Sequence, residues 1–437
     1  MVDSRSAIGV ELPVTDEPKR PVGSKPRRAR RLFLWGTLGV AALLIAWITY
    51  RAAVGWYVRQ LAGRCHEAWR TGQFVDLEKM AREWVRWDRS QAQPFLYLAD
   101  AAQKRGDYRA AVRWLDQLPT GDPKTVPALV EQTTLLFGPL NDPLEGERAC
   151  LRVLELEPAA VEPRQRLIFY YAQTLQRHKM IDQIREAIRV GSDTREDYVY
   201  LIGAYYLVFS NGAEQNHHWL KNYPDNEHFL VARALHLIGS GIVGDEAKDD
   251  PEPKRIYDFQ RQQMVKEHEA VLLDYMRRFP QNLELLNYFL WQAMTNGEIQ
   301  RVAELLKQVP DSAAGDGRFW RYKGWLLSAQ KKFREAEQAY RKALECHPFD
   351  YPSHHQLAQV LRHLGRESEV AYIQNLGERG NELRRELLQL PNARAVTDEQ
   401  LARIAAYIED CGDQPVADAL KRRLRQATGI AAGTASL

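Results

Sequence analysis

The sequence predicts an all-α fold, a solenoid of stacked helical hairpins preceded by a single N-terminal transmembrane helix. Two observations support this prediction. An uncharged apolar run occupies residues 32–50, close to the N-terminus. From residue 55 onward, apolar residues recur at helical spacing, and a short turn motif returns every 34 residues.

The composition is that of a globular chain whose charge is unevenly spread. The 437 residues are 45% hydrophobic and 27% charged, with a formal net charge of +3. Residues 1–31 carry eight basic and four acidic side chains, which leaves 52 basic against 53 acidic in the rest. A near-neutral body argues against a nucleic-acid partner. The four cysteines are far apart and form no C-x-x-C pair, which argues against structural zinc.

The N-terminus divides into two segments. Residues 1–31 contain no hydrophobic periodicity and are expected to form a flexible basic tail. Residues 32–50 form a helix of about 28 Å at 1.5 Å per residue, close to the thickness of the hydrocarbon core of a bilayer. Trp35 lies near one end of this run, and Trp47 and Tyr50 lie near the other, as interfacial aromatics do. We interpret 32–50 as an uncleaved anchor, because the basic tail is long for a signal peptide and Arg51 follows the run directly.

The charges that flank this anchor predict its orientation. Seven basic residues lie between Lys19 and Arg31, whereas only Arg51, Arg59 and Arg64 lie at a comparable distance on the other side. The positive-inside bias therefore keeps the tail in the cytoplasm and places the body outside it, in the periplasm of a bacterial-type cell. The expected localisation is the cytoplasmic membrane, with one span.

A turn motif with a period of 34 residues marks the body of the chain. Each turn separates two segments of about 12 to 15 residues, so each pair of segments predicts a helical hairpin. Small residues, Ala111 and Ala336, stand three positions after the apolar member of their turns. The turns are Gly72–Phe74, Gly106–Tyr108, Gly297–Ile299, Lys331–Phe333 and Gly365–Glu367.

This pattern resembles the tetratricopeptide repeat family, in its membrane-anchored bacterial form. The clearest unit is 317–350, which has Trp320, Gly324, Phe333, Ala336, Tyr340, Ala343, Leu344 and Pro348 at the family's spacing. Units at 58–91, 92–125, 283–316 and 351–384 are recognisable, and those near 127–160, 164–197 and 198–230 are degenerate. The resemblance implies an open, quasi-one-dimensional superhelix over residues 51–384, with small residues where helices cross and aromatic residues between hairpins.

Two segments depart from the period. Residues 239–257 are expected to form a loop inserted between helices at 226–238 and 259–279. Residues 385–427 are expected to form a C-terminal cap, with a helical pair at 398–410 and 414–426 around the turn Cys411–Asp413. Residues 428–437 are expected to be a frayed tail.

Candidate chemical motifs are weak. Residues 239–244 satisfy G-x-G-x-x-G, but a helical pattern precedes them and an acidic loop follows, so we read them as the end of a helix and not as a nucleotide site. His217–His218 and His354–His355 are adjacent pairs, which point about 100° apart on a helix and cannot chelate a metal from one face. We therefore expect no catalytic residue, no cofactor and no metal.

The family resemblance implies that the first helix of each hairpin lines a concave groove. Tryptophan and arginine are enriched in binding hot spots, so the strip predicts a partner-binding site. The alternative is that Trp291 and Trp325 pack as core. The strip consists of Asn287, Trp291, Met294, Arg318, Arg321, Trp325, His355, Gln359, Arg362 and His363.

The sequence thus predicts a membrane-anchored, non-catalytic scaffold or adaptor that holds a partner protein or peptide in its groove. Two alternatives remain open at this stage. One is an enzyme with a site in the degenerate region 198–260. The other is a structural homo-oligomer of the cell envelope, joined through its anchors or terminal helices.

Overall fold

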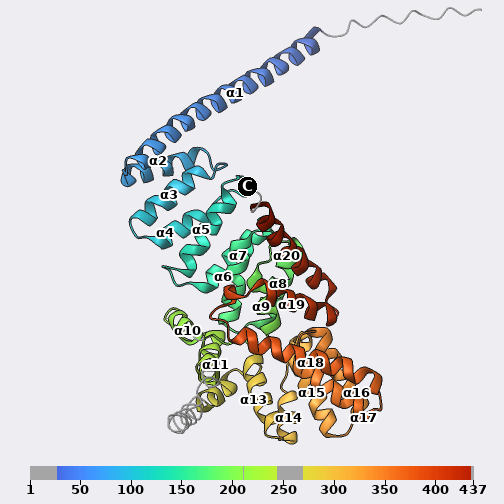
Figure 1. Cartoon of the computed structure of the whole chain (residues 1–437). Coiled ribbons are helices and arrows are strands. Elements are labelled where there is room, and N and C mark those ends of the chain that lie inside the picture. The colour runs from blue at the N-terminus through green and yellow to red at the C-terminus, as the bar shows by residue number, and fades with distance from the viewer. Residues whose placement is uncertain (1–26, 210, 244–268, 435–437) are drawn as a thin grey trace, which may run out of the picture. The chain divides into compact units, whose positions relative to one another are not determined.

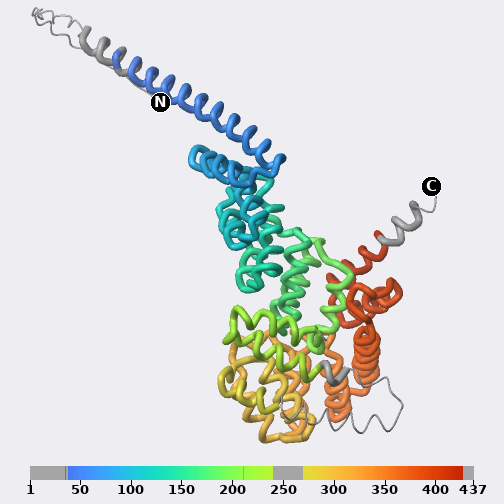
Figure 2. The backbone as a smooth tube through the Cα atoms, turned by 90° about the vertical axis from the view of Figure 1, so that its left-hand side faces the viewer, coloured from blue at the N-terminus to red at the C-terminus, as the bar shows by residue number. Residues whose placement is uncertain are grey.

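The computed structural model describes residues 27–209, 211–243 and 269–434, and every regular element in these ranges is a helix (Figures 1 and 2). The prediction of an all-α fold is confirmed. Residues 269–278 are also helical. The helices are α1 (Arg27–Arg70), α2 (Phe74–Trp87), α3 (Gln93–Lys104), α4 (Tyr108–Leu115), α5 (Thr125–Phe137), α6 (Pro143–Leu156), α7 (Val161–Gln173), α8 (Arg177–Val190), α9 (Arg195–Gly203), α10 (Gly212–Leu220), α11 (Glu227–Val243), α13 (Leu283–Thr295), α14 (Ile299–Leu306), η1 (Asp311–Gly315), α15 (Gly317–Ala329), α16 (Phe333–Cys346), α17 (Tyr351–His363), α18 (Glu367–Leu388), η2 (Ala393–Ala395), α19 (Asp398–Asp410) and α20 (Gln414–Thr434).

The chain forms two compact units, residues 1–88 and 89–437. In the first unit, α1 is one continuous helix that contains the apolar run and also the first half of the first hairpin. It begins at Arg27, inside the segment expected to be a tail. Among the described residues, α1 holds the one helical stretch long and apolar enough to cross a bilayer. Its C-terminal part packs on α2 through a buried stripe, Val58, Leu61, Cys65 and Ala68, which faces Leu77, Ala81, Trp84 and Val85.

The second unit is built from consecutive antiparallel hairpins. The pairs are α3–α4, α5–α6, α7–α8, α10–α11, α13–α14, α15–α16, α17–α18 and α19–α20. The turn glycines end their helices in the left-handed conformation, as at Gly106, where φ is +77°. Lys331 takes the same conformation in the α15–α16 turn, with φ at +59°, and Leu175 does so in the α7–α8 turn, with φ at +55°; neither turn contains glycine.

In hairpin α15–α16, small residues allow the two helices to approach each other closely. Ala336 and Tyr340 are fully buried. A Cβ atom on Gly324 would lie 2.7 Å from the ring of Tyr340, so the absence of a side chain lets α15 approach that ring. Trp320 lies nearer the surface than expected, because its indole N–H donates to the carbonyl of Ala314 at 2.8 Å instead of filling the layer between hairpins.

Ala336→Leu is expected to cost about 1–3 kcal/mol of unfolding free energy, because three further carbon atoms must enter a filled crossing. Ala336 contacts a core that includes Leu357 and Leu361, so hydrogen-exchange protection should fall across residues 317–384. Ala329→Leu, at an exposed position of α15, is the matched control and should leave protection unchanged. Equal exchange in both variants would contradict the assigned crossing.

The expectation of an open, one-dimensional array is wrong, because the C-terminal helices fold back onto the middle of the chain. Helices α18, α19 and η2 pack on α9, and α20 packs on α8 (Figure 1). Arg423 pairs with Asp193 at 2.8 Å, and Arg195 pairs with Asp398 at 2.5 Å. Helix α9 is short and does not form a hairpin with α10, so its apolar surface is covered by helices from the far end of the sequence.

The boundaries of the irregular segments differ in part from the expected ones. Helix α11 continues to Val243, so the first five residues of the expected 239–257 loop are helical, and the rest of that loop lies outside the described residues. The C-terminal pair matches closely, with α19 at Asp398–Asp410 and α20 beginning at Gln414, but α18 extends to Leu388 and α20 to Thr434.

Candidate partner-binding site

The residues predicted to line the groove differ widely in exposure. Trp291 is 50% exposed on α13, and Gln359 and Arg362 are exposed on α17. Arg318 and Arg321 are only 1% and 5% exposed, so the expectation that they lie on an accessible strip is wrong. His363 is also exposed, with its ring stacked on Phe333. The remaining members are partly covered. Trp325 packs on the core around α13 and α15, His355 lies against Gly377, and Asn287 and Met294 are half-buried.

Arg321 is buried because it has a carboxylate partner. It forms an ion pair with Asp350, which is fully buried at the start of α17. Tyr206, from the segment after α9, donates its hydroxyl to the same carboxylate at 2.8 Å. Burial opposes the charge of Asp350, but Arg321 and the hydroxyl of Ser353 outweigh burial and hold the pKa of Asp350 below its usual value. This cluster ties α15 and α17 to the middle of the chain.

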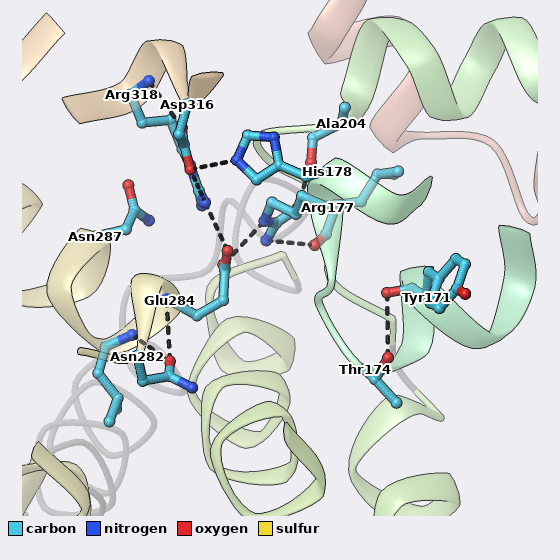
Figure 3. A network of polar contacts seen from close by, with 12 residues as sticks. Tyr171, Thr174, Arg177, His178, Ala204, Asn282, Glu284, Asn287, Asp316 and Arg318 are labelled. Carbon is cyan, nitrogen blue, oxygen red and sulfur yellow. Dashed lines mark hydrogen bonds and ion pairs between the residues drawn. The ribbon is translucent and has the colours of Figure 1, made fainter. Parts of the chain in front are cut away.

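Arg318 lies at the centre of a second buried network, shown in Figure 3. Its Nη2 contacts Glu284 Oε1 and Asp316 Oδ2, both at 2.7 Å. Arg177, at the start of α8, contacts the other oxygen of Glu284 at 3.0 Å, and His178 Nε2 lies 3.0 Å from Asp316 Oδ2. The N-terminal ends of α8, α13 and α15 therefore meet at four charged side chains and one histidine.

The charges in this network compensate one another. Burial alone would raise the pKa of both carboxyl groups, but the positive charge of Arg318 outweighs it and lowers the pKa of Asp316. Arg318 and Arg177 together lower the pKa of Glu284 in the same way. Because the opposite charges of three hairpins pair with one another, we interpret the network as a structural joint between hairpins.

Two buried histidines, His236 and His354, contact backbone carbonyl groups. His236 is buried, accepts the backbone N–H of Phe209 at Nδ1, and therefore donates from Nε2 to the carbonyl of Gln173 at 2.8 Å. Burial lowers the pKa of His236 to about 4, so this ring is neutral at pH 7. His217 and His218 are exposed on α10, and the buried His354 contacts the carbonyl of Pro348 at 2.9 Å. Within the described ranges, no three His, Cys, Asp or Glu side chains gather to hold a metal.

A different feature offers space for a ligand, and we call it the α9 cavity. It has a volume of about 620 Å³ and lies between α7, the segment from α9 to residue 211, and residues 387–393. Both the middle and the C-terminal part of the chain are needed to form its walls. It is lined by Phe169, Gln173, Val199, Tyr200, Leu207, Val208, Phe209, Asn211, Leu387, Leu388, Leu390, Pro391, Asn392 and Ala393.

Apolar residues predominate in the lining of the α9 cavity, and the polar part includes the amide side chains of Gln173, Asn211 and Asn392. Phe169 is 43% exposed, and the leucines on the opposite wall come from the end of α18 and the segment after it. Gln173 is fully buried and donates to Asn211 Oδ1 at 3.3 Å, but its Oε1 atom has no hydrogen-bond partner in the described residues. Buried acceptors are normally paired, so this oxygen marks a position where a donor would be favourable.

The sequence pattern does not indicate this cavity. The local feature that could have indicated the cavity is the apolar triplet 207–209, which lies in the region where the repeat pattern is weakest. Nothing in the local pattern shows that residues 387–393 lie opposite, since about 180 residues separate the two walls.

Comparisons with known proteins agree with this architecture. Residues 339–369, from the middle of α16 through α17 to the start of α18, match the family model of the tetratricopeptide repeat, which confirms the resemblance inferred from the turn spacing. No curated protein matches the chain significantly.

Solved structures resemble the chain only weakly. The crystal structure of the APC/C hetero-tetramer Cut9–Hcn1 is 14% identical, with 85% of this chain and 79% of that chain covered and a TM-score of 0.30. For a tetratricopeptide repeat protein from Parabacteroides merdae, the identity is 10%, the coverage 62% and 98%, and the TM-score 0.28. For yeast Tom70 these values are 14%, 85% and 77%, and 0.26. At such TM-scores, the partners of those proteins imply nothing about this chain.

Proposed function

We propose that this chain, which contains a tetratricopeptide repeat within an all-helical array, is a membrane-anchored scaffold that holds an apolar segment of a partner protein in the α9 cavity. The helical-repeat fold is typical of protein-interaction scaffolds that work without catalysis. The observation that carries the proposal is the α9 cavity itself, which combines a volume of about 620 Å³ with a lining in which aromatic and aliphatic side chains predominate. Ligand sites in proteins have this size and character.

The lining indicates what kind of segment fits. Aromatic and leucine side chains surround the space, so burial of apolar side chains would supply most of the binding energy. The single orphaned acceptor, Oε1 of Gln173, favours a segment that also brings one N–H or O–H donor. A peptide with leucine or phenylalanine next to a tryptophan satisfies both conditions, because the indole is apolar and carries one donor.

Peptide selection on the full chain tests this site. Peptides selected from a random library should be apolar, and Phe169→Asp should weaken their binding at least about ten-fold, because a carboxylate would lose water at an apolar wall. Phe169 is partly exposed, so the variant should keep the helical circular dichroism of the native chain. Fluorescence anisotropy with a labelled peptide measures the effect.

Trp291→Ala is the matched control, because Trp291 is an exposed aromatic residue of the groove that the sequence predicts. It should leave the affinity unchanged. If Trp291→Ala abolishes binding and Phe169→Asp has no effect, the partner lies along α13 to α17 and the α9 cavity is not the site.

The anchor and its orientation are part of the proposal. The apolar stretch of α1 is long enough to span a bilayer, and none of it is buried against the rest of the chain. The basic excess before residue 32 supports a cytoplasmic N-terminus and an extracytoplasmic body.

Reporter fusions after residue 437 test the orientation. An alkaline phosphatase fusion should be active, and a fluorescent protein that matures only in the cytoplasm should be dark. The converse result would place the helical body in the cytoplasm, and recovery of both fusions in the soluble fraction would contradict the anchor itself.

A further inference from the structure

The apolar span and the first hairpin share one helix, so no flexible linker separates them. The uncharged run ends at Tyr50, and Val58 of the same helix is already buried against α2. Eight residues of α-helix rise about 12 Å, so the hairpin begins within about that distance of the end of the span.

Helix α2 runs back toward the span, because it is antiparallel to the end of α1. Tyr57 shows this directly, since its hydroxyl donates to Glu83 at 2.6 Å and its ring meets Trp87 edge-on at 5.9 Å. The C-terminal end of α2 therefore lies level with Tyr57, about 10 Å beyond Tyr50. Val75, at the other end of α2, lies about 18 Å farther away along the helix axis.

The end of the hairpin that faces the span carries exposed aromatic and basic side chains. Trp56 and Trp87 are 58% and 47% exposed, although both are large enough to fill a core. Arg59 and Arg86 are exposed and form no ion pair within the described residues, whereas Arg70, at the far end, pairs with Glu67. Tryptophan and arginine at this level match the composition of a membrane interface.

The distances also fit the headgroup layer. This layer adds about 5–7 Å on each side of the hydrocarbon core. Trp56 lies about 9 Å beyond Tyr50, and a side chain on an α-helix leans toward the N-terminus of that helix, which for α1 is the direction of the span. The indole of Trp56 can thus reach the headgroups, and Arg59 leans in the same direction. Side chains of the antiparallel α2 lean away from the span, so Arg86 reaches the phosphates by extending its long stem from the end of α2 that faces the span.

We propose that the span-facing end of the α1–α2 hairpin binds the phospholipid headgroups of the bilayer that α1 crosses. Trp56 and Trp87 lie among the headgroups, and Arg59 and Arg86 pair with lipid phosphates. The proposal rests on the proposed membrane anchor. Its consequence is that the hairpin is attached to the bilayer through two helices and does not swing about residue 50.

Photo-crosslinking of the full chain in nanodiscs that contain anionic phospholipid tests this proposal. The photoreactive residue p-benzoylphenylalanine is introduced singly in place of Leu44, Val75 or Trp87. Leu44 lies within the apolar run, and Val75 is 77% exposed at the far end of α2. Crosslinks to lipid are expected from positions 44 and 87 and not from position 75.

The three positions separate the two proposals. Lipid adducts at 44 without adducts at 87 would overturn the headgroup contact and leave the anchor intact. The absence of adducts at 44 would overturn the anchor and, with it, the headgroup contact. Equal yields at 75 and 87 would show non-specific labelling and would also contradict the proposal.

Charge variants test the role of the arginines. With the probe at position 87, Arg59→Glu combined with Arg86→Glu should lower the lipid crosslinking yield by about five-fold or more. Lys79→Glu, an exposed basic position nearer the middle of α2, is the matched control and should leave the yield unchanged. Equal lipid crosslinking yields in the double variant and the native background would show that Arg59 and Arg86 do not pair with lipid phosphates.

Discussion

Replacement of Arg318 by methionine is expected to destabilise the folded chain by about 3–5 kcal/mol, because it leaves two buried carboxylates without their main partner. Glu284 and Asp316 each contact the same Nη2 atom of Arg318 at 2.7 Å. Asp316 is fully buried, so no water can replace the lost charge. Arg177 would still face Glu284 and His178 would still face Asp316, which limits the loss.

Urea unfolding and hydrogen exchange of the full chain in nanodiscs measure this effect. Exchange should accelerate at the starts of α8, α13 and α15 together, because the network joins all three. The matched control is Arg189→Met, which removes an exposed ion pair with Glu186 and should change stability by no more than about 0.5 kcal/mol. Similar losses in the two variants would show that the buried network is not a joint.

The pH dependence supplies a second readout. The pKa values of Glu284 and Asp316 are lowered in the folded chain, so the stability these groups add is present above their unfolded pKa, near 4, and is lost as the pH falls through their folded values. In the Arg318→Met variant, less positive charge opposes the effect of burial, so the pKa values of Glu284 and Asp316 rise. Protonation of these carboxyl groups at lower pH then removes the cost of burying their negative charges. The difference in stability between native and variant chains should therefore shrink as the pH falls from 6 to 4. A constant difference would contradict the electrostatic origin.

The hairpins could be predicted from the sequence because their determinants are local. A turn such as Gly106–Tyr108 fixes where one helix ends and the next begins, and the 34-residue spacing repeats that local event. The same spacing predicts the position of α15, but it does not predict that Arg318 and Arg321 of this helix are buried. Asp316 stands next to α15 in sequence, yet Glu284 and Arg177 come from other hairpins, and only their positions in space explain why Arg318 is buried.

No local sequence feature predicts that the C-terminal helices pack against α8 and α9. This packing depends on the rotation between successive hairpins, and small deviations in the degenerate units near 127–230 accumulate over many helices. Asp193 and Arg423 are 230 residues apart, and neither is unusual where it stands. The α9 cavity escaped prediction for the same reason, since its two walls become neighbours only after the chain has closed.

Deletion of residues 397–437 is expected to unfold the middle of the chain. Leu401, Ile404, Ile408 and Leu420 are fully buried in the same core as α9. Each such side chain contributes about 1.5–3 kcal/mol, so their combined loss is comparable with the whole stability of a typical domain, about 5–15 kcal/mol. The deletion also removes Asp398, the partner of Arg195, and Arg423, the partner of Asp193.

Hydrogen exchange shows whether protection is lost only in helices next to the deletion in sequence or also in helices that contact the deleted residues. Protection should fall at least about 100-fold in α9, some 200 residues from the cut, and should change little in α13 and α14, which have a separate core. Deletion of residues 428–437 alone is the matched control and should leave α9 protected. Peptide binding at the α9 cavity should be lost with α9, because the wall formed by residues 387–393 then has nothing to face. If protection is lost only next to the cut, α9 is stable without α19 and α20, and these two helices are not needed to hold the site.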